Sequence, residues 1–93
     1  MTQIDAARDG AVLAGRSHAQ TLREEIEDAA RADDVVVDFS RVLTMSPSFA
    51  DELFAKLDSD LVETGRVDFQ HLSPAVRAIA DFVISGRRGS VAT

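Results

Sequence analysis

The chain has 93 residues, of which 45% are hydrophobic and 28% charged, a composition typical of a single globular domain. It contains no cysteine, which excludes disulfides, zinc–thiolate sites and thiol catalysis. A formal net charge of −6, with no tryptophan, no tyrosine and only five phenylalanines, argues against binding to nucleic acid. No apolar run approaches the roughly 20 residues that span a bilayer, so we expect a cytoplasmic protein that does not bind membranes.

A first helix is predicted from Ser17 to about Arg31. Ser17 and Gln20 have the spacing of a capping box, in which the serine hydroxyl accepts the Gln20 amide and the Gln20 side chain reaches back. Five apolar residues recur at helical spacing and are expected to face the core: Ala19, Leu22, Ile26, Ala29 and Ala30. The charged residues of this helix fall mostly off the apolar stripe and should face water.

A central strand is predicted at residues 35–39. Three consecutive β-branched valines disfavour a helix, and the uninterrupted apolar run indicates a strand that is covered on both faces. After this strand, Val42, Leu43 and Met45 are expected to lie beneath the next helix. Before the first helix, residues 2–13 are predicted to form one or two edge strands.

The second helix has the clearest predicted start in the chain. Ser46 is a favourable N-cap, and Pro47 suits the first helical position, where its missing N–H costs nothing. We expect one helix from here to Gly65, which suits the position just after a helix. Its buried face should carry Phe49, Ala50, Leu53, Phe54, Leu57 and Leu61.

The rest of the chain predicts another strand of the same sheet and a third helix. Residues 66–69 are expected to form a short strand, so that residues 34–69 make a β-α-β unit. Ser73 and Pro74 repeat the helix start seen at Ser46, and this helix should end near Gly86. Its inward residues are predicted to be Val76, Ile79, Ala80 and Val83.

Together these elements predict one α/β domain, in which a mixed β-sheet is packed with about three helices. Residues 1–93 should form this single domain, with a core at about residues 12–86. Residues 87–93 are predicted to be a flexible tail.

The chain offers few groups for catalysis, and we expect it not to be an enzyme. Asp38 ends the central strand and His71 follows the last strand, at the sheet edge where sites of α/β proteins form. Asp38 could equally accept backbone N–H groups of the following turn. His18 is expected to be an exposed residue in the first turn of the first helix. No cofactor and no metal are predicted, because the sequence has neither a phosphate-binding glycine loop nor convergent ligand spacing.

Asp51 and Glu52 are adjacent acidic residues near the start of the second helix. Neighbouring side chains on an α-helix diverge by about 100°, so these two are not expected to share a proton. Both lie near the positive end of the helix dipole. If they form a binding surface, the complementary patch on the partner should be basic.

The segment from Val35 to Leu53 resembles a known family. The run Phe49-Ala-Asp-Glu-Leu53, which follows the strand end at Asp38-Phe39, carries most of the resemblance, and Gly15-Arg16-Ser17 is similar to the family's helix start. On these residues the chain is similar to the bacterial STAS-like domains, relatives of the anti-sigma factor antagonist domains, over about residues 12–85.

The resemblance implies a regulatory protein–protein module without catalysis of its own. In the antagonists, a partner kinase of the histidine-kinase-like ATPase type phosphorylates a serine at the start of the second helix, and the added charge releases the partner. The antagonist sequence Asp-Ser-Ser-Gly aligns with Ser46-Pro47-Ser48-Phe49 here, so the phosphoacceptor position is Pro47, which has no hydroxyl. Ser48 and Ser46 flank this position and are the candidate phosphorylation sites.

Two functional hypotheses follow, and a third concerns assembly. The first is an adaptor for transcriptional or stress signalling that binds an ATPase or anti-sigma-type kinase through Ser46, Ser48, Asp51 and Glu52. The alternative is a small ligand-sensing or enzymatic module that uses Asp38 and His71. A homodimer or a subunit of a larger complex also remains open.

Overall fold

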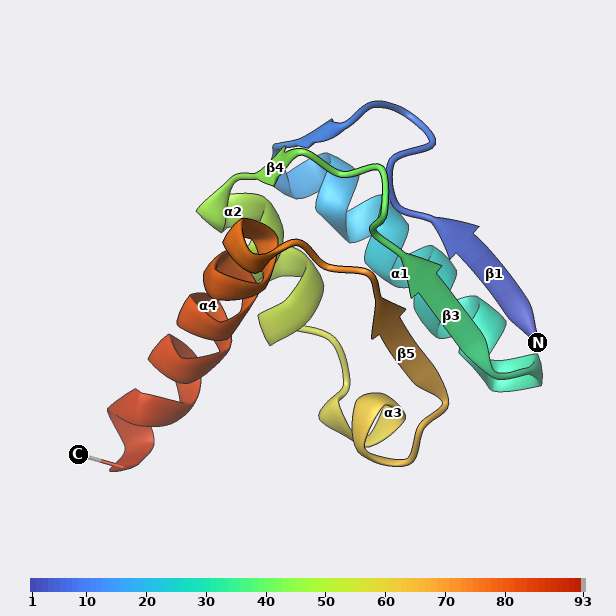
Figure 1. Ribbon diagram of the computed structural model, residues 1–93. Coiled ribbons are helices and arrows are strands. Elements are labelled where there is room, and N and C mark those ends of the chain that lie inside the picture. Colours follow the sequence, from blue (N-terminus) through green and yellow to red (C-terminus); the bar gives the residue numbers. More distant parts are fainter. Residues whose placement is uncertain (93) are drawn as a thin grey trace.

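The computed structural model describes residues 1–92, and the side chains of residues 1–86 (Figure 1). The main sheet has the strand order β1 (Thr2–Asp5), β3 (Val35–Asp38) and β5 (Val67–Gln70). A second, two-stranded sheet pairs β2 (Val12–Leu13) with β4 (Thr44–Met45). The α/β class and the central position of β3 are therefore confirmed.

All strand pairs among the described residues are parallel, whereas the sequence suggested a mixed sheet. The reason is the connectivity, because helical segments separate every two strands that pair. Antiparallel neighbours can be joined by a tight hairpin, but parallel neighbours need such a crossover. The connection from β3 to β5 is the predicted β-α-β unit.

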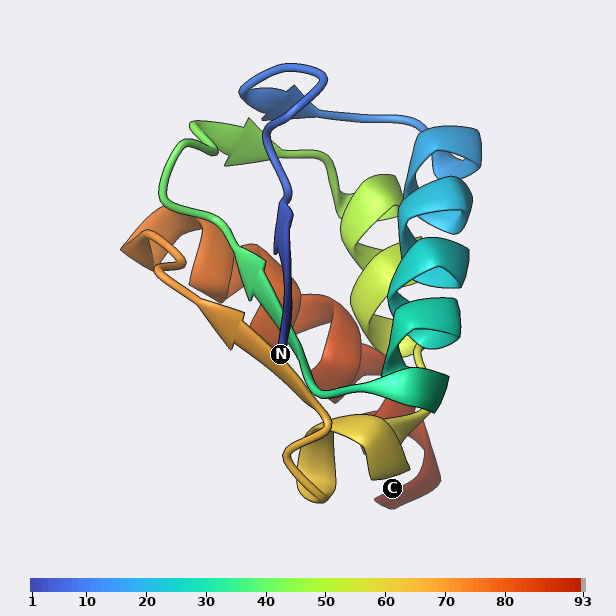
Figure 2. The same cartoon turned by 90° about the vertical axis from the view of Figure 1, so that its right-hand side faces the viewer.

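The main sheet is packed on one face, so the prediction that β3 is covered on both faces is wrong. Val35 and Val37 are buried, but Val36 between them is half-buried. In register with Val36 lie Gln3 of β1 and Asp68 of β5, and both are exposed. Figure 2 shows the helical layer of α1 and α2 on one side of the strands.

Helix α1 (Arg16–Ala32) matches its predicted length and buried face but not its predicted start. Ala19, Leu22, Ile26 and Ala30 are buried, and Ala29 packs against them half-buried. The N-cap is Gly15, at φ 90°, and it makes no side-chain cap. Ser17 lies inside the helix, so the predicted capping box does not form; the Gln20 side chain donates to Glu24 instead.

The second predicted helix is divided into three pieces. It begins as α2 (Pro47–Ala50), widens into the π-helical segment η1 (Asp51–Ala55) and resumes as α3 (Ser59–Glu63). The break has a local cause, because the carboxylate of Asp58 accepts the amide of Asp60 at 3.0 Å and starts a new helix. The predicted buried face is confirmed for Phe49, Ala50, Leu53 and Leu57, whereas Phe54 and Leu61 are half-buried.

The connection before α2 differs from the prediction at one residue. Val42 and Met45 are buried as expected, but Leu43 is 74% exposed. The amide of Leu43 donates to the carbonyl of Ala11 at 2.8 Å, which joins this segment to the chain just before β2. Leu43 therefore lies on the surface and not beneath the helix.

Helix α4 (Pro74–Ala92) begins as predicted and continues beyond the predicted end at Gly86. The hydroxyl of Ser73 accepts the amide of Val76 at 3.2 Å. The inward residues Val76, Ala80 and Val83 are buried, and Ile79 is half-buried. The flexible tail predicted for residues 87–93 lies outside the residues whose side chains are described. Within the described chain, no helix is long and apolar enough to cross a membrane.

Candidate functional site

The start of α2 has the geometry that the Ser-Pro sequence predicts. The hydroxyl of Ser46 accepts the amide of Phe49 at 3.1 Å, and Pro47 occupies the beginning of the helix. The hydroxyls of Ser46 and Ser48 lie 3.2 Å apart, and both residues are half-buried. Ser46 is therefore engaged as a helix cap, and the hydroxyl of Ser48 contacts that capping group.

Glu52 is a buried carboxylate, with only 5% of its surface exposed. It is bound by three cationic side chains. Lys56 donates to its Oε1 at 3.0 Å, Arg23 to its Oε2 at 3.2 Å, and Arg16 to its Oε1 at 3.4 Å. Such burial is tolerated because the charge is paired and hydrogen-bonded on both oxygens.

Asp51 contacts the same guanidinium as Glu52. Nη1 of Arg16 lies 3.1 Å from Oδ2 of Asp51 and 3.4 Å from Oε1 of Glu52. The two carboxylates therefore converge on one cation, although an α-helix would turn them apart. The wider π-helical turn of η1 changes the angle between successive side chains, and it begins at Asp51.

The ionised form of Glu52 is favoured by these neighbours. Its pKa is lowered, first by the hydrogen bond from Lys56 and then by the hydrogen bond from Arg16 and the charge of Arg23, against the opposing effect of desolvation. We call these five residues, Arg16, Arg23, Asp51, Glu52 and Lys56, the Glu52 cluster. Three cations against two carboxylates give it a net formal charge of +1, so its acidic residues do not form the free acidic surface that the sequence suggested.

The sequence did not lead us to the three cations of the Glu52 cluster, although the spacing of these residues along the chain indicated that they could meet a carboxylate. Arg16 and Arg23 are seven residues apart and therefore lie on one face of α1, two turns apart. Lys56 follows Glu52 by four residues, the spacing of a helical ion pair. What the sequence could not show is that α1 packs against η1 and brings both arginines to the same carboxylate.

Asp38 accepts hydrogen bonds from the turn that follows β3, which is the structural alternative to a catalytic role. Its Oδ1 accepts the amide of Ser40 at 2.9 Å, and its Oδ2 accepts the hydroxyl of Ser40 at 3.0 Å. Its pKa is lowered chiefly by the bond from the Ser40 amide, with a smaller contribution from the charge of His71. Both carboxylate oxygens thus stabilise the turn after β3.

The two histidines lie in different environments. His71 is exposed, in a left-handed backbone conformation at φ 62°, just after β5. His18 is half-buried and not exposed as expected, because its ring packs edge-on against Phe49 at 5.4 Å. Within the described part of the chain, no group of three or more His, Asp or Glu residues could hold a metal ion.

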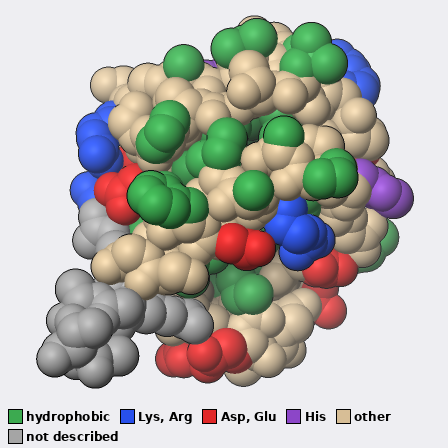
Figure 3. All heavy atoms as spheres, turned by 60° about the vertical axis from the view of Figure 1, so that its left-hand side comes forward, with side chains coloured by type: hydrophobic (Ala, Val, Ile, Leu, Met, Phe, Trp, Pro, Cys, Tyr) green, Lys and Arg blue, Asp and Glu red, His purple; other side chains and the backbone are tan. Residues whose placement is uncertain are grey.

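Apolar side chains remain exposed beside the start of α2. Leu43 is 74% exposed and Val12 is 62% exposed. Val12 pairs in register with Thr44, the residue after Leu43, and the Leu43 amide donates to the carbonyl of Ala11, the residue before Val12, so the backbones at Val12 and Leu43 are neighbours. Figure 3 shows hydrophobic side chains at the surface on the side of the molecule that carries α2 and α4. We call Val12, Leu43, Ser46 and Ser48 the α2-start surface.

One comparison with known proteins identifies a family. A family model described as a STAS-like domain of unknown function (DUF4325) matches residues 18–77, which is more than half of the chain. The match includes most of α1, the central strand, the Glu52 cluster except Arg16, and the start of α4. Searches of curated proteins and of solved structures gave no significant match.

Proposed function

Because the chain belongs to the family of STAS-like domains described as DUF4325, we propose that it is a non-catalytic regulatory module that binds another protein through the α2-start surface. The observation that carries the proposal is the exposure of Leu43 and Val12 beside the start of α2. Large apolar side chains that cluster on a surface are typical of sites where another protein docks.

The polar groups around this surface suit recognition better than catalysis. The Ser46 hydroxyl caps α2, and the oxygens of Asp38 are used in the turn at Ser40. The carboxylates of the Glu52 cluster are paired within the domain, so they position η1 and are less available to a partner. Arg16, whose side chain is 55% exposed, is the member of the cluster that a partner could reach most easily.

The proposed partner class comes from the resemblance to the anti-sigma factor antagonist domains. We propose an ATPase or anti-sigma-type kinase, in transcriptional or stress signalling. If phosphorylation regulates this contact, Ser48 is the better acceptor, because Ser46 uses its hydroxyl as a helix cap and Pro47 has none.

The proposal is tested with a matched pair of surface variants. Leu43→Lys and Phe82→Lys each replace a hydrophobic residue that is about equally exposed, at 74% and 73% respectively. Candidate kinases of this class would be purified, and their affinity for each variant measured by interferometry. We expect Leu43→Lys to weaken binding at least about tenfold, as for a central interface residue, and Phe82→Lys to leave it nearly unchanged.

Two results would contradict the proposal. If both variants bind as tightly as the unmodified protein, the interface lies elsewhere. If no kinase of this class binds the unmodified protein at micromolar concentrations, the proposed partner class is wrong.

A further inference from the structure

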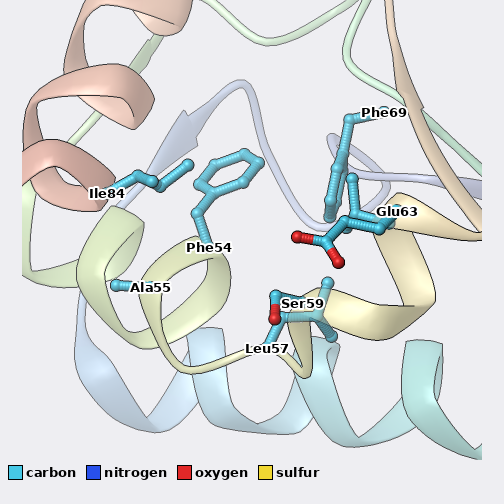
Figure 4. Close-up of a pocket in the computed structure, with 8 residues that line it drawn as sticks. Phe54, Ala55, Leu57, Ser59, Glu63, Phe69 and Ile84 are labelled. Carbon is cyan, nitrogen blue, oxygen red and sulfur yellow. The ribbon is translucent and has the colours of Figure 1, made fainter. Parts of the chain in front are cut away.

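The break in the second predicted helix opens a hollow between α3, β5 and α4. It has a volume of about 470 Å³, within the range of roughly 300–1,000 Å³ that small-molecule sites occupy. Phe54 and Ile84 lie on one side of it, and Phe69 and Glu63 on the other (Figure 4). The chain changes direction at residues 56–58, between η1 and α3, which a continuous helix from Pro47 to Gly65 would not do.

The walls of the hollow are mostly apolar. The rings of Phe54 and Phe69 lie 4.8 Å apart between centroids, at an angle of 60°. Both residues are half-buried, and Val62 at the same hollow is 46% exposed. These side chains leave apolar surface in contact with water, so an apolar group that entered the hollow would be stabilised by its burial.

One charged group points into this apolar space. The carboxylate of Glu63 is directed toward the rings of Phe54 and Phe69 (Figure 4). Among the described residues, no cation forms an ion pair with Glu63, although most other carboxylates near the helices have one. A cation placed here would meet a carboxylate beside two aromatic rings, whose electron-rich faces attract positive charge.

The charged residues around this space are mostly acidic. A second hollow shares Phe54, Val62, Phe69 and Ile84 with the first and is bordered by Asp68, Asp81 and Arg77. Together with Glu63, the charged residues along both hollows whose side chains the structure describes carry a net formal charge of −2. This charge favours a positively charged ligand and opposes a negatively charged one.

We propose that the hollow binds a small organic cation: an amine that carries an aromatic or aliphatic group. The apolar part would lie against Phe54, Phe69 and Ile84, and the ammonium group would pair with Glu63. Asp38 and His71 do not border the hollow, so this site is separate from the strand-end site that the sequence offered. It also does not depend on the α2-start surface.

Three probes with similar carbon skeletons test the charge requirement. Phenethylamine, phenethyl alcohol and phenylacetate would be titrated into the full chain, labelled with ¹⁵N, and the amide chemical shifts followed by nuclear magnetic resonance. We expect the amine to bind more tightly than the alcohol, and the anion to bind least. The shifted amides should belong to α3, β5 and the adjoining turn of α4.

Two variants test the role of the carboxylate. Glu63→Gln keeps the shape of the side chain and should weaken amine binding by about three- to fivefold, as expected for a partly exposed ion pair, while leaving the alcohol unaffected. Glu24→Gln, at an exposed glutamate of α1, is the matched control and should change neither affinity.

Equal affinity for the amine and the alcohol would overturn the proposal, and so would an unchanged amine affinity in Glu63→Gln. Shifts confined to residues near Asp38 and His71 would also overturn it, because the amine would then bind at the strand ends. Absence of any shift with millimolar amine would exclude this ligand class.

Discussion

Arg23 of α1 and Glu52 of η1 lie 3.2 Å apart, from Nη2 to Oε2, where the Glu52 side chain is only 7% exposed. This contact joins two helical segments that are 29 residues apart in the chain. Because the Glu52 carboxylate is almost fully removed from water, its charge must be paired within the protein. Lys56 and Arg16 supply the other ion pairs.

Removal of the Glu52 carboxylate should destabilise the fold, because within the Glu52 cluster it leaves three cations with Asp51 as the remaining carboxylate. We expect Glu52→Gln to lower the melting temperature by about 5 °C or more, measured by differential scanning calorimetry. Glu24→Gln, on the exposed side of α1, should change it by less than about 2 °C. Equal effects of the two substitutions would show that the Glu52 cluster contributes no special stability.

The cluster also predicts how stability depends on pH. The pKa of Glu52 is lower in the folded protein than its ordinary value. Ionised Glu52 therefore stabilises the fold above the unfolded pKa of about 4.3, and this stabilisation is lost as the pH falls through the lower, folded value. Urea denaturation at a series of pH values should show a shallower acid loss for Glu52→Gln than for the unmodified chain. Parallel curves of stability against pH for the two proteins would contradict a lowered pKa of Glu52 in the folded state.

Leu53 should be one of the most sensitive core positions, because its side chain is fully buried. We expect Leu53→Ala to lower the free energy of unfolding by about 2–5 kcal/mol, a large part of the total for a small domain. Leu43→Ala removes the same atoms from a residue that is 74% exposed and should cost less than about 0.5 kcal/mol. Urea denaturation of both variants measures the two losses in the free energy of unfolding, and equal losses would contradict the burial of Leu53.

Ser46 and Ser48 should differ in their structural roles. Ser46→Ala removes the cap of α2 and is expected to cost about 1 kcal/mol of stability, whereas Ser48→Ala should change it by less than about 0.5 kcal/mol. Chemical denaturation measures both. A loss at Ser48 equal to that at Ser46 would mean that the contact between the two hydroxyls also stabilises the helix start.

Regulation by phosphorylation makes a separate prediction. If Ser48 is the acceptor, Ser48→Asp should slow association with a partner kinase, because it adds a negative charge beside the contact. Ser48→Asn, which is similar in shape but uncharged, is the control. Association rates at two salt concentrations distinguish the variants, and identical rates for both would remove Ser48 from the interface.

Local patterns in the sequence determined where α2 and α4 begin and most of the residues that enter the core. The Ser-Pro pairs at Ser46 and Ser73 start helices because capping and the fixed proline backbone act within a few residues. The apolar stripes predicted the buried residues Ile26, Leu53 and Val76, since burial follows helical periodicity. The resemblance carried by residues 35–53 also led to the family that the chain belongs to.

Tertiary structure decided the features that depend on contacts between distant segments. The three valines of β3 cannot reveal that the neighbours of Val36 in register are Gln3 and Asp68, so the open face of the sheet was not predicted. The pairing of Glu52 with Arg23 requires α1 to pack against η1, and no local pattern specifies that distance. The hollow beside Glu63 likewise depends on tertiary structure. It exists because α3 turns away from η1, while β5 and α4 close the other sides, and helical periodicity does not encode this arrangement.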